Sequence, residues 1–215
     1  MEKLCIALLI GYLVGSVNVS ILLTRMVGGF DIRTRGSHNA GGTNVARTLG
    51  TGWGVLTILL EILKSCAVGM TAKYWFPAEF PGFLESGATV CALAVLCVCV
   101  LGNAYPCFAG FRGGKGVTVM AAAAIVLDWR VFLCLFALFF VILFLGHYVS
   151  LSSIIASLGL PIGAWFVLRG TDGVWVAVGL SAFLAFHVLF RHRSNIQRLV
   201  QGKENRFSWK KGKNS

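Results

Sequence analysis

The chain has 215 residues, of which 57% are hydrophobic and only 13% are charged. Soluble proteins are about 45–50% apolar and about 25% charged, so a water-soluble single domain is excluded. The 19 Lys and Arg against 8 Asp and Glu give a net charge of +11, which has to gather outside the apolar segments. Because no soluble domain accompanies it, this charge suits anionic lipid headgroups or phosphorylated small molecules better than nucleic acid.

Seven apolar segments predict an all-α, polytopic membrane protein with about seven transmembrane helices. The segments are residues 4–24, 53–75, 86–104, 116–128, 131–147, 151–168 and 173–190. Most of them approach or exceed the roughly 18–20 residues that cross a bilayer as a helix, whereas 116–128 is short. We expect residues 1–206 to form a single transmembrane domain and residues 207–215 to form a short basic tail.

The distribution of positive charge indicates that the short segment also crosses the membrane. With seven crossings, fourteen of the Lys and Arg residues fall on one side. The positive-inside rule makes that side cytoplasmic, so the N-terminus is expected outside and the C-terminus in the cytoplasm. If residues 116–128 did not cross, the basic tail would move to the other side and the charge bias would largely disappear.

The first basic segment of this cytoplasmic side is residues 31–47. It combines glycines that let backbone amides approach a ligand, neutral hydrogen-bonding side chains, and cations. The glycines are Gly36, Gly41 and Gly42. The neutral hydrogen-bonding residues are Ser37, Asn39, Thr43 and Asn44, and the cations are Arg33, Arg35 and Arg47. The segment is typical of an anion-binding loop at a helix N-terminus, and a solvated turn is the alternative.

The second segment, residues 110–116, is another glycine loop that opens a helix. It contains Arg112, Gly113, Gly114, Lys115 and Gly116, a pattern that suits a phosphate group. Gly116 stands where a nucleotide-binding P-loop needs Ser or Thr, so nucleotide hydrolysis is not expected. The alternative is that the two cations anchor the span at lipid headgroups.

The third segment, residues 191–206, follows the last apolar stretch. At helical spacing Arg191, Asn195 and Arg198 share one face, although a juxtamembrane helix on anionic lipid would explain the basic residues as well. The seven cysteines form no CxxC pair, and the acidic residues on this side are Asp31 and Glu204. We therefore expect neither a metal site nor a cofactor.

Together these motifs resemble a known family. The patterns GSxNxGxTNxxR, YPxFxxFxGGKG and RHRxNIxRLxxGxExRF are similar to those of the integral membrane acyl-phosphate:glycerol 3-phosphate acyltransferases. The resemblance extends across essentially the whole chain. It implies transfer of a fatty acyl group from acyl phosphate to the sn-1 hydroxyl of glycerol 3-phosphate, the first acylation step of phospholipid biosynthesis. It also implies a multi-pass protein of the bacterial inner membrane with a cytoplasmic active site, functionally coupled to the soluble enzyme that makes acyl phosphate.

The resemblance also implies which residues act. Ser37, Arg47, Lys115, Asn195 and Glu204 match family positions tied to substrate binding and catalysis. Further motif positions are matched by Asn39, Asn44, Gly113, Gly114, His192 and Arg193. The chain departs from the family at two positions, because His38 replaces a usual glycine and Asn103 replaces a usual histidine. Asparagine cannot exchange a proton near neutral pH, so a general base at position 103 is not expected.

The chemistry of acyl transfer agrees with the composition. Acyl phosphate has a good leaving group, so the enzyme has to align two phosphorylated molecules and neutralise their charge. We expect Arg47 and Lys115 to bind phosphate and Ser37 with the glycine amides to hold the acyl phosphate. Asn195 is then expected to position glycerol 3-phosphate, and Glu204 to orient basic partners.

The sequence leaves open which group accepts the hydroxyl proton of glycerol 3-phosphate. A substrate phosphate oxygen with a pKa near 6 is the preferred base, and His192 and His38 are the alternatives. A Ser37 acyl-enzyme is a competing mechanism that would need a base beside the hydroxyl.

Two further features bear on these predictions. Glu61 and Lys64 lie one turn apart in the second apolar segment, and we expect them to form a structural ion pair; the alternative is that Lys64 reaches toward the active site. The alternative function is a phosphate or phospho-metabolite transporter, for which glycine-interrupted helices and basic loops would also be expected.

Overall fold

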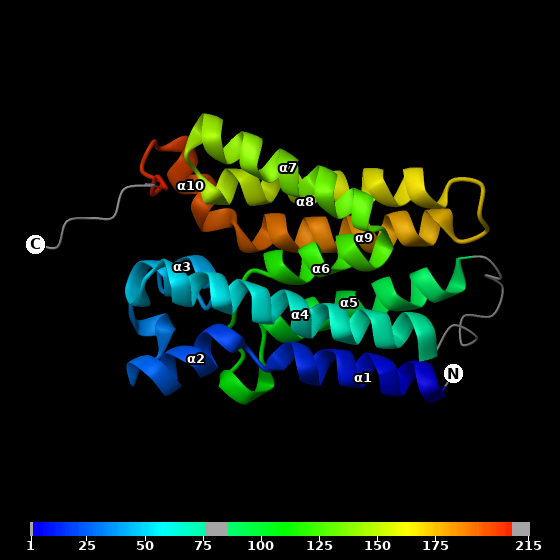
Figure 1. The fold of residues 1–215 in the computed structure, drawn as a ribbon, viewed down its shortest axis with the longest axis horizontal. Helices are drawn as coiled ribbons and strands as arrows, with labels where there is room; N and C mark the ends of the chain where they lie inside the picture. Colours follow the sequence, from blue (N-terminus) through cyan, green and yellow to red (C-terminus); the bar gives the residue numbers. More distant parts are fainter. Residues whose placement is uncertain (1, 76–85, 208–215) are drawn as a thin grey trace, which may run out of the picture.

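The described part of the chain, residues 2–75 and 86–207 of a computed structural model, is a bundle of helices without strands (Figure 1). The elements are α1 (Glu2–Ser16), α2 (Val19–Gly28), η1 (Ile32–Thr34), α3 (Gly42–Leu49), α4 (Thr51–Trp75), α5 (Gly87–Ala104), η3 (Cys107–Ala109), α6 (Val117–Leu127), α7 (Trp129–Gly146), α8 (Val149–Leu168), α9 (Val174–Arg191) and α10 (Arg193–Val200). The all-α prediction is confirmed.

Six helical stretches in the described residues are long and apolar enough to cross a membrane. They are Glu2–Gly28, Thr51–Trp75, Gly87–Ala109, Trp129–Gly146, Val149–Leu168 and Val174–Arg191. Large apolar side chains such as Leu63, Phe144 and Phe186 point outward from them and suit contact with lipid tails. The protein is therefore an integral, multi-pass membrane protein.

The short helix α6 is the seventh apolar helix. Its 11 residues span only about 16 Å, against a hydrocarbon core of about 30 Å. It lies inside the bundle, where it packs against α4, α5, α7, α8 and α9 (Figure 1). At its end, Lys73 Nζ donates to the carbonyl oxygen of Val126 at 2.8 Å. Protein contacts thus shelter α6 from lipid and satisfy its C-terminal backbone.

The first predicted span, 4–24, is not one continuous helix. It breaks between α1 and α2, where the Asn18 side chain accepts a hydrogen bond from Ile21 N–H and caps α2. An asparagine that bonds its own backbone favours a helix start over a helix interior, which explains the break. The predicted ion pair of α4 is confirmed, since Lys64 Nζ lies 2.8 Å from Glu61 Oε2.

Helix α5 forms the centre of the core and is buried along most of its length. Small residues let α1 lie directly against it. A Cβ added at Gly15 would come 2.3 Å from the carbonyl oxygen of Cys99, and one at Gly102 would come 2.3 Å from that of Tyr12. Such close backbone contact is the usual way in which membrane helices associate without a hydrophobic driving force.

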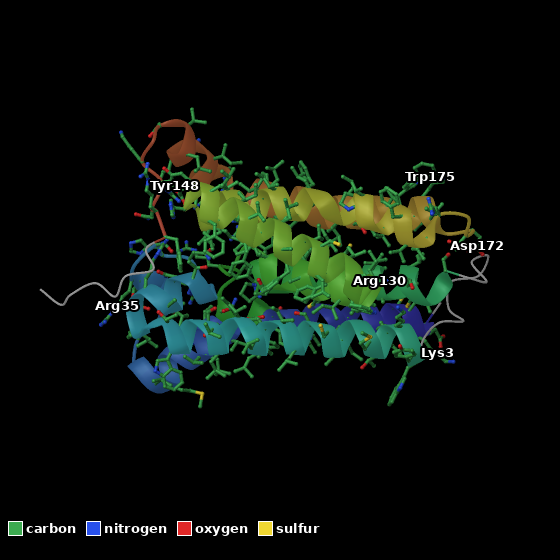
Figure 2. The ribbon with its side chains drawn as sticks, turned by 45° about the horizontal axis from the view of Figure 1, so that its top comes forward. Lys3, Arg35, Arg130, Tyr148, Asp172 and Trp175 are labelled. Atoms are coloured by element: carbon green, nitrogen blue, oxygen red, sulfur yellow. The ribbon has the colours of Figure 1, made fainter. Side chains whose placement is uncertain are left out.

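The two ends of the bundle carry different segments of the chain. Figure 2 shows Lys3, Asp172 and Trp175 at one end, and Arg35 and Tyr148 at the other. The second end carries α3 and α10 and is opposite the start of α1, as an odd number of crossings requires (Figure 1). Of the predicted tail 207–215, only Phe207 is among the described residues, and its N–H donates to the carbonyl oxygen of His147 at 2.6 Å.

Candidate active site

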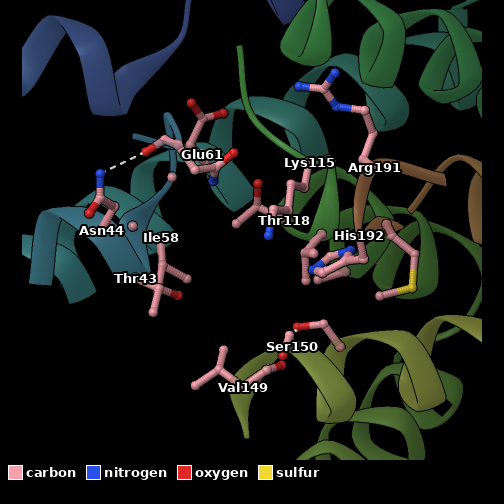
Figure 3. Close-up of a pocket in the computed structure, with 18 of the residues that line it drawn as sticks. Thr43, Asn44, Ile58, Glu61, Lys115, Thr118, Val149, Ser150, Arg191 and His192 are labelled. Carbon is pink, nitrogen blue, oxygen red and sulfur yellow. Dashed lines mark hydrogen bonds between the residues drawn. The ribbon is translucent and has the colours of Figure 1, made fainter. Parts of the chain in front are cut away.

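A cavity of about 910 Å³ brings the three sequence motifs together. The predicted site residues that line it are Ser37, Asn39, Gly41, Gly42, Thr43, Asn44, Arg47, Lys115, Gly116, His192, Arg193, Asn195 and Glu204. Figure 3 shows Thr43, Lys115, Ser150 and His192 around the same space. The motifs lie far apart in the chain, so only the packing of the helices unites them.

Four helices, α3, α6, α8 and α10, begin at the wall of this cavity. Their first residues line it, namely Gly42, Thr43, Val117, Thr118, Val149, Ser150, Arg193 and Ser194. The first amide groups of a helix have no intrahelical partner and carry partial positive charge. Four such ends around one space favour anionic ligands.

Asn44 organises the loop before α3. Its Nδ2 donates to three backbone carbonyl oxygens between residues 32 and 39, at 2.9 to 3.2 Å, and its Oδ1 accepts from Ser37 N–H at 2.8 Å. Gly36 has φ +60°, and a Cβ there would lie 2.2 Å from Asn44 Oδ1. Gly36 is not among the residues that line the cavity, and its lack of a side chain makes room for Asn44. That its amide contacts a ligand stays a prediction.

The predicted cations of the first motif have different surroundings. Arg33 lies 2.7 Å from Asp31 Oδ2 and also donates to the carbonyl oxygen of Arg112 at 2.9 Å. Hydrogen bonds from Arg33 hold the pKa of Asp31 well below its ordinary value. Arg35 lies over the ring of Phe30. Neither of these arginines lines the cavity, whereas Arg47 does.

The glycines of the second motif serve packing. Gly113 and Gly114 donate their N–H groups to the carbonyl oxygens of Ala104 and Asn103, each at 3.0 Å. A Cβ on Gly113 would lie 2.0 Å from Asn103 O. Arg112 is exposed. Arg112, Gly113 and Gly114 are not among the residues that line the cavity, and their contact with phosphate stays a prediction.

A chain of polar contacts joins the second motif to the third. Lys115 Nζ donates to Asn195 Oδ1 at 2.5 Å, and Asn195 Nδ2 donates to Glu204 Oε1 at 2.6 Å. The other carboxylate oxygen of Glu204 accepts from Arg198 Nε at 2.7 Å, and Ser150 Oγ donates to Oε1 at 2.9 Å. Glu204 thus connects the third motif to the start of α8.

The electrostatics of the cavity are dominated by uncompensated positive charge. Burial, together with the charges of Arg198, Arg191 and Arg47, lowers the pKa of Lys115 to about 8 against the opposing effect of Glu204. The carboxylates among the described lining residues are Glu61 and Glu204, and each already has a basic partner.

His192 is buried beside this cluster. Burial and the charge of Lys115 lower the pKa of His192 to about 4. Its Nδ1 lies 2.8 Å from the carbonyl oxygen of Val188, which can only accept, so Nδ1 carries the proton and Nε2 keeps a lone pair. His192 is therefore a neutral hydrogen-bonding group at pH 7.

Several residues of the cavity were not predicted as site residues. They are Arg191, Arg198, Ser150, Glu61 and Asn103. Helical spacing had placed Arg191 and Arg198 on the face of Asn195, but contact with anionic lipid explained them equally well. The start of α8 had no sequence signal, because its role depends on where the helix ends lie.

The deeper part of the cavity is apolar. Helices α4, α6 and α7 supply Val55, Ile58, Leu59, Ile62, Met120, Ala121, Ala124, Ile125, Phe132, Leu135, Phe136, Phe139 and Phe140. A single cavity thus offers a cationic, hydrogen-bonding part beside a long hydrocarbon-lined part. This combination suits an amphiphile with an anionic head and an acyl chain.

Comparison with known proteins agrees with this geometry. The glycerol-3-phosphate acyltransferase family model matches residues 5–202. Glycerol-3-phosphate acyltransferases are 37% identical in Syntrophotalea carbinolica, over 96% of this chain and 99% of that protein, and 37% identical in Desulforudis audaxviator, over 98% and 100%.

Solved structures are similar over the same length. The crystal structure of PlsY (YgiH), an integral membrane glycerol 3-phosphate acyltransferase, in its glycerol 3-phosphate form has a TM-score of 0.82 at 30% identity. Its lysophosphatidic acid form has a TM-score of 0.77 at 30% identity. Each comparison covers 96% of both chains. The matched motifs, the shared helical plan and the full-length similarity show that this chain belongs to the glycerol-3-phosphate acyltransferase family.

Proposed function

We propose that the protein transfers a fatty acyl group from acyl phosphate to the sn-1 hydroxyl of glycerol 3-phosphate, forming 1-acylglycerol 3-phosphate and phosphate. The observation that carries the proposal is the continuity of a cationic cluster and an apolar groove in one cavity. Acyl transfer to glycerol 3-phosphate is the activity for which the related proteins are named. The choice of acyl phosphate as donor rests on the charge of the cavity.

The positive charge suits two phosphate groups. Arg47, Lys115, Arg191, Arg193 and Arg198 line the cavity. Each substrate phosphate carries about −1.5 to −2 at neutral pH, so one phosphate would leave much of this charge unbalanced. A donor and an acceptor that are both phosphorylated would balance it, with further help from the helix N-termini.

The roles of individual residues follow from their positions. Arg47 and Lys115, which both line the polar part, bind phosphate groups. Ser37 and the amides at the start of α3 hold the acyl phosphate, and Asn195, held between Lys115 and Glu204, positions glycerol 3-phosphate. Glu204 keeps these partners oriented.

The reaction is a direct transfer in this proposal. The sn-1 oxygen forms a bond to the acyl carbonyl carbon, the bond from that carbon to the phosphate oxygen breaks, and phosphate leaves with the electron pair. His192 is a weak base because of its lowered pKa, whereas a phosphate oxygen with a pKa near 6 can take the hydroxyl proton. An acyl-enzyme would need a base beside the Ser37 hydroxyl, and the neighbouring His38 directs its Nδ1 to the carbonyl oxygen of Arg33 instead.

The apolar part of the cavity receives the acyl chain. Ile58 of α4, Ala124 of α6 and Phe136 of α7 line this part from three sides. Burial of a long chain there is favourable by about 0.8 kcal/mol per CH₂ group. The substrate is then oriented with its carbonyl at the boundary between the apolar and the cationic part.

The same charge distribution supports a location in the bacterial inner membrane with the site on the cytoplasmic face. The polar lining comes from the end of the bundle that carries α3 and α10 (Figure 1). A transporter would instead be expected to hold its substrate near the bilayer midplane. Acyl phosphate would be delivered to this face by the soluble enzyme that makes it.

The deciding experiment supplies the purified protein with palmitoyl phosphate and glycerol 3-phosphate and measures phosphate and 1-palmitoylglycerol 3-phosphate. We expect both products in equal amounts. Product from palmitoyl-CoA alone would contradict acyl phosphate as donor. Uptake of glycerol 3-phosphate into vesicles without any product would contradict the enzyme.

A further inference from the structure

The break between α1 and α2 leaves backbone groups that the helices cannot pair. Unpaired backbone groups cost several kcal/mol each inside a membrane, so they need partners from elsewhere. Helix α4 supplies both. The N–H of Val19 donates to Glu61 Oε1 at 2.7 Å, and Lys64 Nζ donates to the carbonyl oxygen of Val17 at 2.6 Å.

Glu61 has a second role that its pairing with Lys64 does not explain. Its Oε2 accepts from Lys64 Nζ at 2.8 Å and also from Asn103 Nδ2 of α5 at 3.3 Å. Glu61 is only 3% exposed and lines the cavity (Figure 3). Asn103 lines the same cavity. One buried carboxylate therefore joins the start of α2 and the end of α5 to α4.

The groups that Glu61 holds are adjacent to the two cationic loops of the site. On one side, the carbonyl oxygen of Asn103 accepts from Gly114 N–H at 3.0 Å, and the next residue is Lys115. On the other side, Asn18 precedes Val19 and its Nδ2 donates to the carbonyl oxygen of Ala40 at 3.5 Å, just before the N-cap of α3.

The two loops also touch each other. A Cβ on Gly114 would lie 2.7 Å from the carbonyl oxygen of Ala40, so the backbone that bears Lys115 lies directly on the backbone that opens α3. A shift of either loop would therefore change the separation of Lys115 from the α3 N-terminus. That separation decides whether both can act on the same pair of phosphate groups.

We propose that Glu61 is a positioning residue for acyl transfer, which acts through Asn103 and the α1–α2 break to hold the Lys115 loop and the start of α3 in register. Because Lys64 compensates its charge, Glu61 can lie at the cavity wall without repelling the substrate phosphates. The inference rests on the proposed function for its assay, and it differs from a purely structural ion pair in what it predicts for turnover.

The test uses variants that avoid an unpaired buried charge. The double variant Glu61→Gln/Lys64→Met removes both charges. Because Val19 and Asn103 bond different carboxylate oxygens, the carboxamide presents an oxygen to one of these donors and an NH₂ group, which cannot accept, to the other. Asn103→Leu removes the same contact from the other side, and Asn103→His restores a donor. Ser65→Ala is the matched control, since Ser65 is a fully buried residue one turn further along α4 that does not line the cavity.

We expect kcat for the double variant and for Asn103→Leu to fall at least about tenfold, with Ser65→Ala and Asn103→His within about twofold of wild type. Combining Glu61→Gln/Lys64→Met with Asn103→Leu should lose less than the two separate losses would give if they were independent, because both changes act on the Glu61–Asn103 contact. Wild-type kcat and KM in Asn103→Leu, or losses that add, would overturn the inference. If the double variant does not fold, Asn103→Leu and Asn103→His decide.

A failure of the proposed function is separate from these outcomes. Wild-type protein that forms no product from palmitoyl phosphate contradicts the donor but not the positioning. In that case the rise in melting temperature produced by glycerol 3-phosphate replaces kcat as the measurement. We expect a smaller rise in Asn103→Leu than in Ser65→Ala, and equal rises would overturn the inference.

Discussion

Replacing Lys115 with methionine tests the electrostatic basis of the site. The change keeps a long side chain but removes the ammonium group that lies among Arg47, Arg191 and Arg198 and donates to Asn195. A charge-assisted hydrogen bond contributes about 1.5–3 kcal/mol, and each 1.36 kcal/mol is about tenfold in rate. We therefore expect kcat/KM for glycerol 3-phosphate to fall about 10- to 150-fold at pH 7.

The pH dependence gives the same prediction a second, independent measurement. Burial lowers the pKa of Lys115 to about 8, so the free enzyme loses this proton as the pH rises through that value. Phosphate binding needs the protonated form, so kcat/KM of the wild type should be constant from about pH 7 to 7.5 and about tenfold lower at pH 9. Lys115→Met should lack this decline, because it has no proton to lose.

The assay measures initial rates of lysophosphatidate formation at saturating palmitoyl phosphate, with spontaneous hydrolysis of the donor subtracted. Lys203→Met is the control, because Lys203 is an exposed lysine outside the cavity. The reasoning would be refuted by a wild-type profile that is flat up to about pH 9.5. A decline above pH 8 that persists in Lys115→Met would refute it equally.

Three further predictions concern the base, the backbone and the third motif. His192→Gln should keep kcat within about tenfold of wild type in the same assay, because a histidine with a pKa of about 4 contributes little as a base. A loss of about a thousandfold would contradict substrate-assisted attack. Gly116→Ala should lower the free energy of unfolding by about 2 kcal/mol or more, since Gly116 has φ +82° and a Cβ would lie 2.2 Å from Val100 Cγ2. In thermal unfolding, Gly179→Ala should instead be neutral or stabilising, because nothing lies within 4 Å of its Cβ position. Glu204→Gln should lower kcat/KM about tenfold and lower the melting temperature at pH 7. Burial raises the pKa of Glu204, but the hydrogen bonds to its carboxylate outweigh burial and hold the pKa below its ordinary value. The ionised carboxylate therefore stabilises the fold at pH 7, and this stabilisation is lost as the pH falls through the lowered pKa. The difference in melting temperature between wild type and Glu204→Gln should therefore shrink as the pH falls below the ordinary carboxyl pKa of 4.5, and a constant difference would contradict the role of the carboxylate.

Local properties of the chain were sufficient for much of this description. The length and apolarity of seven segments predicted an all-α membrane protein. Unpaired backbone N–H and C=O groups are costly in lipid, and a single apolar segment pairs them internally only as a helix. The residue types of the three motifs predicted a phosphate site. One cavity is lined by Ser37, Arg47, Lys115, Asn195 and Glu204, and their roles in substrate binding stay predictions.

Other roles depended on contacts between distant residues. Gly36, Gly113 and Gly114 have the pattern of ligand-binding glycines, but the structure gives each of them a packing reason. A Cβ at these positions would clash with Asn44, Asn103 and Ala40, respectively. Glycine is required equally by an approaching ligand and by an approaching backbone, and composition alone does not separate the two. The same limit applies to Arg33, whose pairing with Asp31 removes it from the cavity.

The sequence by itself determined the class of the protein, the course of its helices, the excess of positive charge and the residues that can bind phosphate, because hydropathy, helical spacing and side-chain chemistry are local. Only the tertiary structure decided that four helix N-termini meet at one cavity, that an apolar groove continues from it, and that Glu61 joins the α1–α2 break to Asn103. These features depend on how the helices pack, and the packing is set by small residues and buried hydrogen bonds between segments far apart in the chain.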